Sequence, residues 1–412
     1  MSHINAKTTN HFPMFDNLRT LMVLLVLVFH SGASYGSAVD FWPFHETDPS
    51  MLIDIFMLLG DTFMMAVLFF IAGYFAVSSA HKHGGWGFIR NKFKRVAIPW
   101  LLITLFLLPL LDYVHYHARS IQQGVQARGY VMHWLLSLKE IGRFRTGWLD
   151  MSSYINMTEQ FYQRYMWFLS LLFIFFIIFI AIYEINKKIV KEKDASIHEK
   201  EFSQRSVFAV LVLISIITIL LFSLVRFLLY PEFMVSGWFS LVGIIQCQVG
   251  KLGIYACYFS LGCYAYSKKW FFEKIDFGRP WLWILSCFLL FGGNMAVLGF
   301  ITKYTHHPIG LRIAFVILYP LWTLSFLGFF MAVANKYWNR STSFSQNLAS
   351  NSYNMYLLHY IFPMTLPLLL SAWTGGPVLL KFGIVAAVTI LASYGISRYI
   401  MKPLSRFYIP VI

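Results

Sequence analysis

Charged residues are scarce in this sequence. Only 12% of its 412 residues are Asp, Glu, Lys or Arg, whereas a soluble domain averages about 25%. Hydrophobic residues make up 58% of the chain and aromatic residues 19%. A soluble chain of this composition would lack the polar side chains needed to cover its surface. The composition therefore excludes an ordinary soluble domain and indicates a protein embedded in a lipid bilayer, where aromatic residues suit the interfaces.

Acidic residues are rarer than basic ones, and the net charge is +15. Such an excess of Lys and Arg is typical of some nucleic-acid binders. Here the basic residues lie in short segments between apolar runs, which is the pattern that sets membrane orientation. We therefore expect the lipid bilayer as a partner and no nucleic acid.

Cysteine is rare as well, with four residues and no C-x-x-C pair. All four lie in predicted membrane segments, so we expect neither a disulfide framework nor a zinc site. Histidine pairs occur near the predicted interfaces, but no carboxylate or cysteine completes a metal-binding set, and we expect no bound metal. The sequence also lacks a G-x-S-x-G nucleophile elbow and a glycine-rich phosphate loop.

Long apolar runs are what the sequence has in abundance. A helix that crosses a bilayer needs about 20 apolar residues, and isolated strands cannot satisfy their backbone groups in lipid. We therefore predict an all-α polytopic membrane protein, a single domain over residues 1–412, with about ten transmembrane helices. The predicted spans are 18–37, 53–79, 96–117, 164–183, 207–230, 238–266, 281–301, 311–334, 350–372 and 377–400.

The loops between these spans indicate the orientation. With the N-terminus inside, cytoplasmic segments hold about twice as many Lys and Arg residues as outer ones. We therefore expect both termini to be cytoplasmic and the protein to be integral to the cytoplasmic (inner) membrane. A long outer loop at 118–163 is a candidate cover or entrance for an outer acceptor site. Residues 184–206 carry mixed charges and are expected to form a solvated cytoplasmic loop.

The first apolar run, LRTLMVLLVLVFH at 18–30, has an ionisable residue near each end. We interpret it as a membrane span and not as a cleaved signal peptide, because many apolar runs follow and because it contains a histidine. Arg19 and His30 are 11 residues apart, which places both on one helical face about 16 Å apart along the axis. A histidine at this depth can accept a proton from a hydroxyl. A histidine that only packs against a neighbouring helix is the alternative.

Three further stretches follow the R-x10-H element, namely FFIAGYF at 69–75, KFKRVAIPW at 92–100 and SYNMYLLHY at 352–360. Together and in this order they resemble the signature of the acyltransferase-3 family of membrane O-acyltransferases, over about residues 14–405. The pattern is closest to the branch that decorates periplasmic glucans with acyl groups such as succinyl. The family has an R-x-x-R element where this chain has Lys92 and Arg95, and lysine binds phosphate without the arginine fork.

The resemblance implies an enzyme that moves an acetyl or succinyl group from cytoplasmic acyl-CoA to a hydroxyl of a glycan or similar acceptor at the outer face. Acyl-CoA is then a donor substrate, and no cofactor stays bound. His30 is expected to act as a general base or a transient acyl carrier. Arg19, Lys92 and Arg95 are expected to hold the donor phosphates at the cytoplasmic mouth, with simple interfacial anchoring as the alternative. Asp61 is expected to orient or charge His30.

Other polar residues of the predicted spans are candidates for substrate binding. Lys251 lies mid-span and needs a carboxylate or an anionic ligand. His359 shares a helical face with Ser352 and Tyr356, and the alternative for it is a polar contact between helices. The substrate-binding candidates are Ser34, Tyr35, Lys251 and His359. Gly73 in FFIAGYF is expected to permit close packing of two helices.

A transporter or flippase of a glycan or lipid-linked intermediate, without acyl chemistry, is the second hypothesis. Intramembrane charges such as Asp61 and Lys251 also occur in such proteins. The sequence has no internal repeat and no inverted pair of Gly/Pro-broken spans, which disfavours this class. The identity of the acyl group, the acceptor and the oligomeric state stay open at this point.

Overall fold

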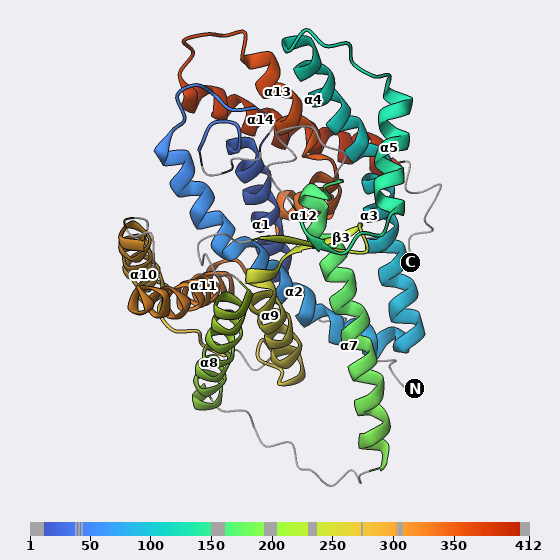
Figure 1. The fold of residues 1–412 in the computed structure, drawn as a ribbon. Helices are drawn as coiled ribbons and strands as arrows, with labels where there is room; N and C mark the ends of the chain where they lie inside the picture. The colour runs from blue at the N-terminus through green and yellow to red at the C-terminus, as the bar shows by residue number, and fades with distance from the viewer. Residues whose placement is uncertain are drawn as a thin grey trace.

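A computed structural model gives the fold (Figure 1). It describes residues 12–37, 39, 42, 44–149, 161–192, 204–229, 237–272, 275–301, 303 and 308–403. Most of these residues are helical. The helices are α1 (Pro13–Gly32), α2 (Met51–Lys92), α3 (Ile98–Leu102), α4 (Leu108–Gln122), α5 (Tyr130–Gly142), α7 (Trp167–Glu192), α8 (Gln204–Leu229), α9 (Val249–Ser267), α10 (Pro280–Ile301), α11 (Ile309–Tyr337), α12 (Ser343–Leu358), α13 (Ile361–Leu370) and α14 (Val378–Ile396).

Short π- and 3₁₀-helical turns link or extend several helices. They are the π-helical η1 (Phe93–Ala97), η2 (Ile103–Leu107) and η4 (Ser397–Met401) and the 3₁₀ turn η3 (Arg164–Met166). The strands are β1 (Gly147–Trp148), β2 (Trp238–Leu241) and β3 (Ile245–Gln248), which form one antiparallel sheet in the order β1-β2-β3. In Figure 1, α1, α12 and β3 occupy the centre, with α8 to α11 on one side and α4 and α5 on the other.

Seven helical segments of the described residues are long and apolar enough to cross a membrane. Six of them match the predicted spans that begin at 18, 164, 207, 281, 311 and 377. The seventh, Met51–Ile121, contains two predicted spans, 53–79 and 96–117. Gly84 has φ of +66° inside it, so the chain changes direction there in a conformation that favours glycine. The structure thus supports a multi-pass helical membrane protein but does not confirm ten spans.

Two predicted spans differ from the structure. The prediction of one helix over 238–266 is wrong for its first part, because 238–248 forms the β2–β3 hairpin and only Val249–Ser267 is helical. The hairpin turns at Gly243, which has φ of +76°. Aromatic and β-branched residues such as Trp238, Phe239 and Ile245 favour strands, and an apolar run alone does not distinguish them from a helix. The span at 350–372 is divided into α12 and α13.

The two predicted loops also contain regular structure. The 118–163 segment holds the end of α4, all of α5 and strand β1. Its residues 150–160 lie outside the described residues. The 184–206 segment holds the end of α7 and the start of α8, and its residues 193–203 also lie outside the described part. The predicted cytoplasmic location of both termini stays a prediction, because 1–11 and 404–412 are not described.

Helices α1 and α12 form a parallel pair that organises the centre of the molecule. Arg19, near the start of α1, lines a cleft together with Ser345 and Ser350 near the start of α12. At the other end of the pair, His30 contacts His359, which directly follows α12. Helix α12 begins with a capping box at Thr342, where side-chain and backbone groups satisfy each other. The two ends of this pair are called the Arg19 end and the His30 end below.

Helices α2 and α9 pack so closely that no side chain separates their backbones at two points. A Cβ atom on Gly73 would lie 2.0 Å from the carbonyl oxygen of Phe259, and one on Gly262 would lie 2.1 Å from the carbonyl oxygen of Phe70. Close approach through small residues is typical of membrane helices. The prediction that Gly73 permits close helix packing is therefore confirmed, and its partner helix is α9.

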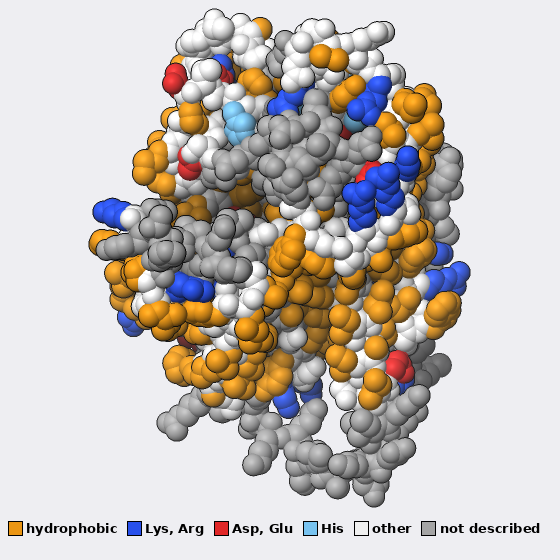
Figure 2. Space-filling view, viewed as in Figure 1, with side chains coloured by type: hydrophobic (Ala, Val, Ile, Leu, Met, Phe, Trp, Pro, Cys, Tyr) orange, Lys and Arg blue, Asp and Glu red, His pale blue; other side chains and the backbone are white. Residues whose placement is uncertain are grey.

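The surface is apolar over a wide area, as the orange side chains in Figure 2 show. Along α8, Phe208, Leu220 and Leu228 have exposed fractions of 70%, 62% and 69%. Phe288 and Leu289 of α10 are exposed to a similar extent. Soluble monomers rarely expose contiguous apolar areas of this kind. These faces are the ones that lipid would cover.

Candidate active site

His30 lies in the last turn of α1 and faces the break between α12 and α13. Its Nδ1 atom is 3.0 Å from the carbonyl oxygen of Val26, one turn earlier, and 3.0 Å from Nε2 of His359. The Nδ1 atom of His359 is 2.6 Å from the carbonyl oxygen of Tyr356. His359 is fully buried. Two histidines that are 329 residues apart in the sequence thus form one hydrogen-bonded pair.

Aromatic side chains surround this histidine pair. The ring of Tyr360 is 5.2 Å from the ring of His30, and Tyr165 stacks on Tyr360 at 4.4 Å. Trp42 stacks nearly parallel to His30, at 6.3 Å and 23°. Trp42 has an exposed fraction of only 4%. An apolar wall of this kind excludes water and strengthens electrostatic interactions inside it.

Ser34 and Tyr35 hold the segment that covers the His30 end. The Oγ atom of Ser34 accepts a hydrogen bond from Nε1 of Trp42 at 2.9 Å. The backbone carbonyl oxygen of Ser34 accepts another from the backbone N–H of Glu46. The carbonyl oxygen of Tyr35 accepts a hydrogen bond from the amide of Ser50. Both predicted substrate-binding residues are buried. They therefore act here as anchors for the segment after α1.

Arg19 lies at the opposite end of α1, beside a cleft. Its Nη2 atom is 3.1 Å from Oδ1 of Asp16, one turn earlier, and the Arg19 side chain is 41% exposed. The cleft has a volume of about 310 Å³. Its lining residues are Pro13, Asp16, Asn17, Arg19, Ser341, Ser345, Gln346, Ala349 and Ser350. His30 is not among them, so this cleft reaches Arg19 and ends short of His30.

Lys92 and Arg95 occupy different surroundings although they are three residues apart. The Nζ atom of Lys92 lies 4.6 Å from the ring centre of Phe176, on α7, in a cation–π contact. The carbonyl oxygen of Arg95 accepts a 2.5 Å hydrogen bond from the hydroxyl of Tyr353, on α12. Helix α12 thus contacts the segment that carries Arg95 and also lines the Arg19 cleft. Neither Lys92 nor Arg95 lines that cleft.

Asp61 and Lys251 form an ion pair between α2 and α9. The Lys251 side chain is 6% exposed and that of Asp61 is 49% exposed. The ring of Tyr319 lies 5.9 Å from the Lys251 ammonium. The expected contact of Asp61 with His30 is not what the structure shows, because Asp61 pairs with Lys251 and His30 pairs with His359. Lys251 has the carboxylate partner that its burial requires.

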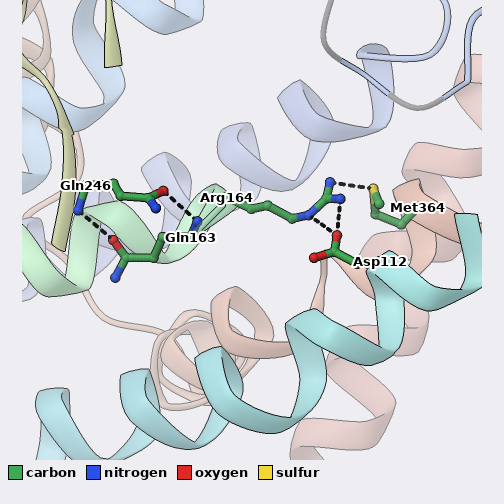
Figure 3. A network of polar contacts seen from close by, with 5 residues as sticks. All are labelled: Asp112, Gln163, Arg164, Gln246 and Met364. Atoms are coloured by element: carbon green, nitrogen blue, oxygen red, sulfur yellow. Dashed lines mark hydrogen bonds and ion pairs between the residues drawn. The ribbon is translucent and has the colours of Figure 1, made fainter. Parts of the chain in front are cut away.

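Figure 3 shows a second polar network, which the sequence interpretation missed. One of its members, Arg164, lies against the Tyr360 ring of the aromatic wall. Gln163 and Arg164 are adjacent but point in opposite directions. The backbone N–H of Gln163 donates to the side-chain Oε1 of Gln246, and the backbone N–H of Gln246 donates to the side-chain Oε1 of Gln163 at 3.0 Å. The guanidinium of Arg164 binds Asp112 on α4, with Nε 2.8 Å from Oδ1, and contacts Met364 Sδ at 3.6 Å.

This network fixes the position of the aromatic wall. The Arg164 guanidinium carbon lies 6.0 Å from the ring centre of Tyr360, and the next residue, Tyr165, stacks on that ring. Arg164 has φ of +49°, which is uncommon for a residue other than glycine. Asp112 was the available sequence signal, because it is an ionisable residue inside the predicted span 96–117. Trp42 has no comparable signal in the sequence.

The described residues contain no group of three or more His, Cys, Asp or Glu side chains that could hold a metal ion. The His30 end brings together two imidazoles and the phenols of Tyr165 and Tyr360. The imidazole of a histidine can accept a proton or attack a carbonyl carbon.

Comparisons with known proteins give one family and one relative. A family model described as an acyltransferase domain matches residues 13–398. Over 109 residues the chain is 31% identical to a protein of Escherichia coli (strain SMS-3-5 / SECEC) named "Glucans biosynthesis protein C", and the match covers 26% of this chain and 28% of that protein. The chain thus spans about a quarter of the length of that relative. No solved structure matches.

Proposed function

The chain belongs to the acyltransferase family, whose domain spans nearly all of it, and we propose that it is a membrane O-acyltransferase that uses acyl-CoA. The donor would be acetyl- or succinyl-CoA from the cytoplasm, and the acceptor a hydroxyl of a glycan or similar compound at the outer face of the inner membrane. The name of the partial E. coli relative supports a glucan as the first acceptor to test.

The observation that carries this proposal is the His30–His359 pair inside the aromatic wall. His30 is partly buried, and its Nδ1 atom lies 3.0 Å from both the Val26 carbonyl oxygen and Nε2 of His359, which holds the ring in one orientation. General-base catalysis needs such a positioned group and contributes about 10²–10⁴-fold to a rate. A histidine in this position on the first membrane helix is also what the family resemblance implies.

The reaction requires one proton transfer in each direction. His30 takes the proton of the acceptor hydroxyl, and the hydroxyl oxygen attacks the thioester carbonyl carbon of the donor. A C–O bond forms, the C–S bond breaks, and the CoA thiolate takes the proton back from His30. Alternatively, a ring nitrogen of His30 attacks the thioester carbonyl carbon, so that an N–C bond forms, the C–S bond breaks and the CoA thiolate leaves. The acceptor hydroxyl then attacks the acyl carbon, the N–C bond breaks, and the hydroxyl proton passes to the thiolate. Both routes yield the same ester and free CoA.

The Arg19 end suits the anionic part of the donor. Arg19 borders a cleft that Ser345 and Ser350 of α12 also line. A guanidinium binds phosphate strongly because it donates paired hydrogen bonds. Arg19 and His30 are about 16 Å apart along α1, and this separation is compatible with a long donor such as CoA that spans the two ends. The segment between the cleft and His30 must then open when the donor enters.

The test compares the wild-type protein with His30→Ala in membrane vesicles. The probes are radiolabelled acetyl- or succinyl-CoA and a glucan extract from bacterial cell envelopes. We expect the wild type to release CoA and to label the glucan, and His30→Ala to lose both by about 10²-fold or more. His117→Ala, which changes an exposed histidine on α4, is the matched control. Equal activity of His30→Ala and the wild type would refute catalysis by His30.

The transporter hypothesis has less support after the structure. Its motivation was the number of predicted spans together with intramembrane charges such as Asp61 and Lys251, and these two charges neutralise each other. The same vesicles test it directly, because a transporter would move the glucan across the bilayer without any acylated product.

A further inference from the structure

The orientation of the hydrogen bonds in the histidine pair identifies which nitrogen of each ring carries a proton. A backbone carbonyl oxygen only accepts hydrogen bonds. The carbonyl of Tyr356 is 2.6 Å from Nδ1 of His359, so this Nδ1 atom carries the hydrogen. His359 is fully buried, and a buried charge without a counter-ion is costly. The ring is therefore neutral, and its Nε2 atom presents a lone pair to His30.

The same reasoning applies to His30. Its Nδ1 atom is 3.0 Å from two acceptors, the carbonyl of Val26 and Nε2 of His359. This Nδ1 atom must carry the hydrogen and share it between them. In the neutral ring the other nitrogen, Nε2, then has no proton. Whether His30 acts as base or as acyl carrier, the reacting atom is Nε2.

We propose, on the basis of the function proposed above, that His359 is a positioning residue that acts through His30 and does not bind the acceptor. It holds the His30 ring with Nε2 free, and its lone pair accepts a stronger hydrogen bond when His30 becomes an imidazolium ion. Hydrogen bonds to charged groups exceed neutral ones in strength. The proton stays on His30, because Nδ1–H of His359 remains bonded to Tyr356 and its ring takes up no charge.

This assignment explains why the pair contains two histidines. In a catalytic triad a carboxylate orients the histidine. Several carboxylates of the described residues have other partners. Asp61 pairs with Lys251, Glu46 with Lys381 and Asp112 with Arg164, and Asp54 accepts hydrogen bonds from the backbone amide and the hydroxyl of Ser37. A neutral imidazole stands where the carboxylate of a triad would be, and it orients His30 without placing a second charge in the apolar wall.

Three substitutions at one position separate positioning from other roles. In His359→Gln, the side-chain amide reaches about as far as the imidazole Nε2 atom and can accept from His30. In His359→Asn, the shorter amide reaches only the Nδ1 position, so it can bond Tyr356 but not His30. In His359→Ala, both hydrogen bonds are lost. The assay uses the labelled donor and glucan extract described above, with kcat and KM measured for each substrate.

We expect His359→Asn and His359→Ala to lower kcat by about 10- to 100-fold, the range for a hydrogen bond to a charged group. His359→Gln should stay within about threefold of the wild type, and KM should change little for either substrate. Nitrogen-15 NMR of histidine-labelled protein should show His30 protonated at Nδ1 alone. Detergent-solubilised variants should elute from size exclusion as the wild type does.

Each other outcome has a definite meaning. A raised acceptor KM with unchanged kcat would assign His359 to acceptor binding and overturn the proposal. Equal losses in the Gln and Asn variants, or wild-type turnover in His359→Ala, would overturn it as well. An inactive His30→Ala with a fully active His359→Ala would refute the positioning role alone. A fully active His30→Ala would refute the proposed function itself.

Discussion

Replacing Gly73 by alanine tests whether the close contact of α2 with α9 holds the scaffold of the site together. The added methyl group would lie 2.0 Å from the carbonyl oxygen of Phe259 and 2.8 Å from its carbonyl carbon, whereas ordinary contacts begin at 3.4 Å. A backbone carbonyl cannot rotate away as a side chain can. The two helices must separate locally, and this also strains the 3.3 Å hydrogen bond from Cys263 Sγ to the Gly73 carbonyl.

The expected cost follows from two opposing effects. Overpacking of a close contact costs about 1–3 kcal/mol, and the upper part of this range applies because the obstacle is backbone. Alanine favours a helix over glycine by about 0.8–1.0 kcal/mol. The net destabilisation should therefore be about 1–2 kcal/mol. Gly262→Ala should behave alike, because its methyl group would lie 2.1 Å from the carbonyl oxygen of Phe70.

The assay is the temperature at which detergent-solubilised protein disappears from its size-exclusion peak. Gly383→Ala on α14 is the matched control, since a Cβ atom there has no neighbour within 4 Å. It should be neutral or slightly stabilising. The variant that combines Gly73→Ala with Gly262→Ala should lose less stability than the sum of the two single losses, because both methyl groups require the same separation of α2 from α9. Equal thermal stability of Gly73→Ala and Gly383→Ala would refute this reasoning.

Three further predictions concern the surroundings of the site. Asp61→Asn should destabilise the protein by about 3–5 kcal/mol, because it leaves the buried ammonium of Lys251 unpaired. Lys251→Met should cost less, since the carboxylate left behind on Asp61 is half exposed. Thermal stability in detergent compares the two variants, and a larger loss in Lys251→Met would contradict this account. Asp112→Asn should likewise destabilise the protein by several kcal/mol, because it leaves the buried guanidinium of Arg164 without its carboxylate. Adding Arg164→Met should restore part of the thermal stability, and fully additive losses in the same assay would argue against the pair. Trp42→Ala should raise CoA release from acyl-CoA without acceptor, because it removes the cover over His30 and admits water; unchanged release would show that Trp42 does not exclude water.

Several features of the site were predictable because they depend on neighbours in the sequence. Helical periodicity alone places Arg19 and His30 on one face of one helix. The pair of Arg19 with Asp16 is a contact across one turn and follows from the same spacing. A glycine in an apolar run indicates close helix packing, and Gly73 shows it. The ordered motifs pointed to the acyltransferase family, which the domain match over 13–398 confirms.

The prediction of one helix over 238–266 failed in its first part, where the chain forms the β2–β3 hairpin. The run that begins at Trp238 is apolar enough for a membrane helix, and hydrophobicity does not distinguish a buried strand from a buried helix. The outcome there depends on Gly243, which makes the turn, and on pairing with β1 from a distant part of the chain. Nothing within the run specifies that partner.

The sequence by itself determined a membrane-embedded helical chain with a cation and an imidazole on one face of its first helix, because hydrophobicity and periodicity act over one or two turns. Only the tertiary structure decided the partners. His359 lies within hydrogen-bond distance of His30, 329 residues away in the sequence, and Lys251 forms an ion pair with Asp61, 190 residues away. Such pairings depend on how helices far apart in the sequence pack, since a buried polar group bonds whichever group the packing brings within about 3 Å.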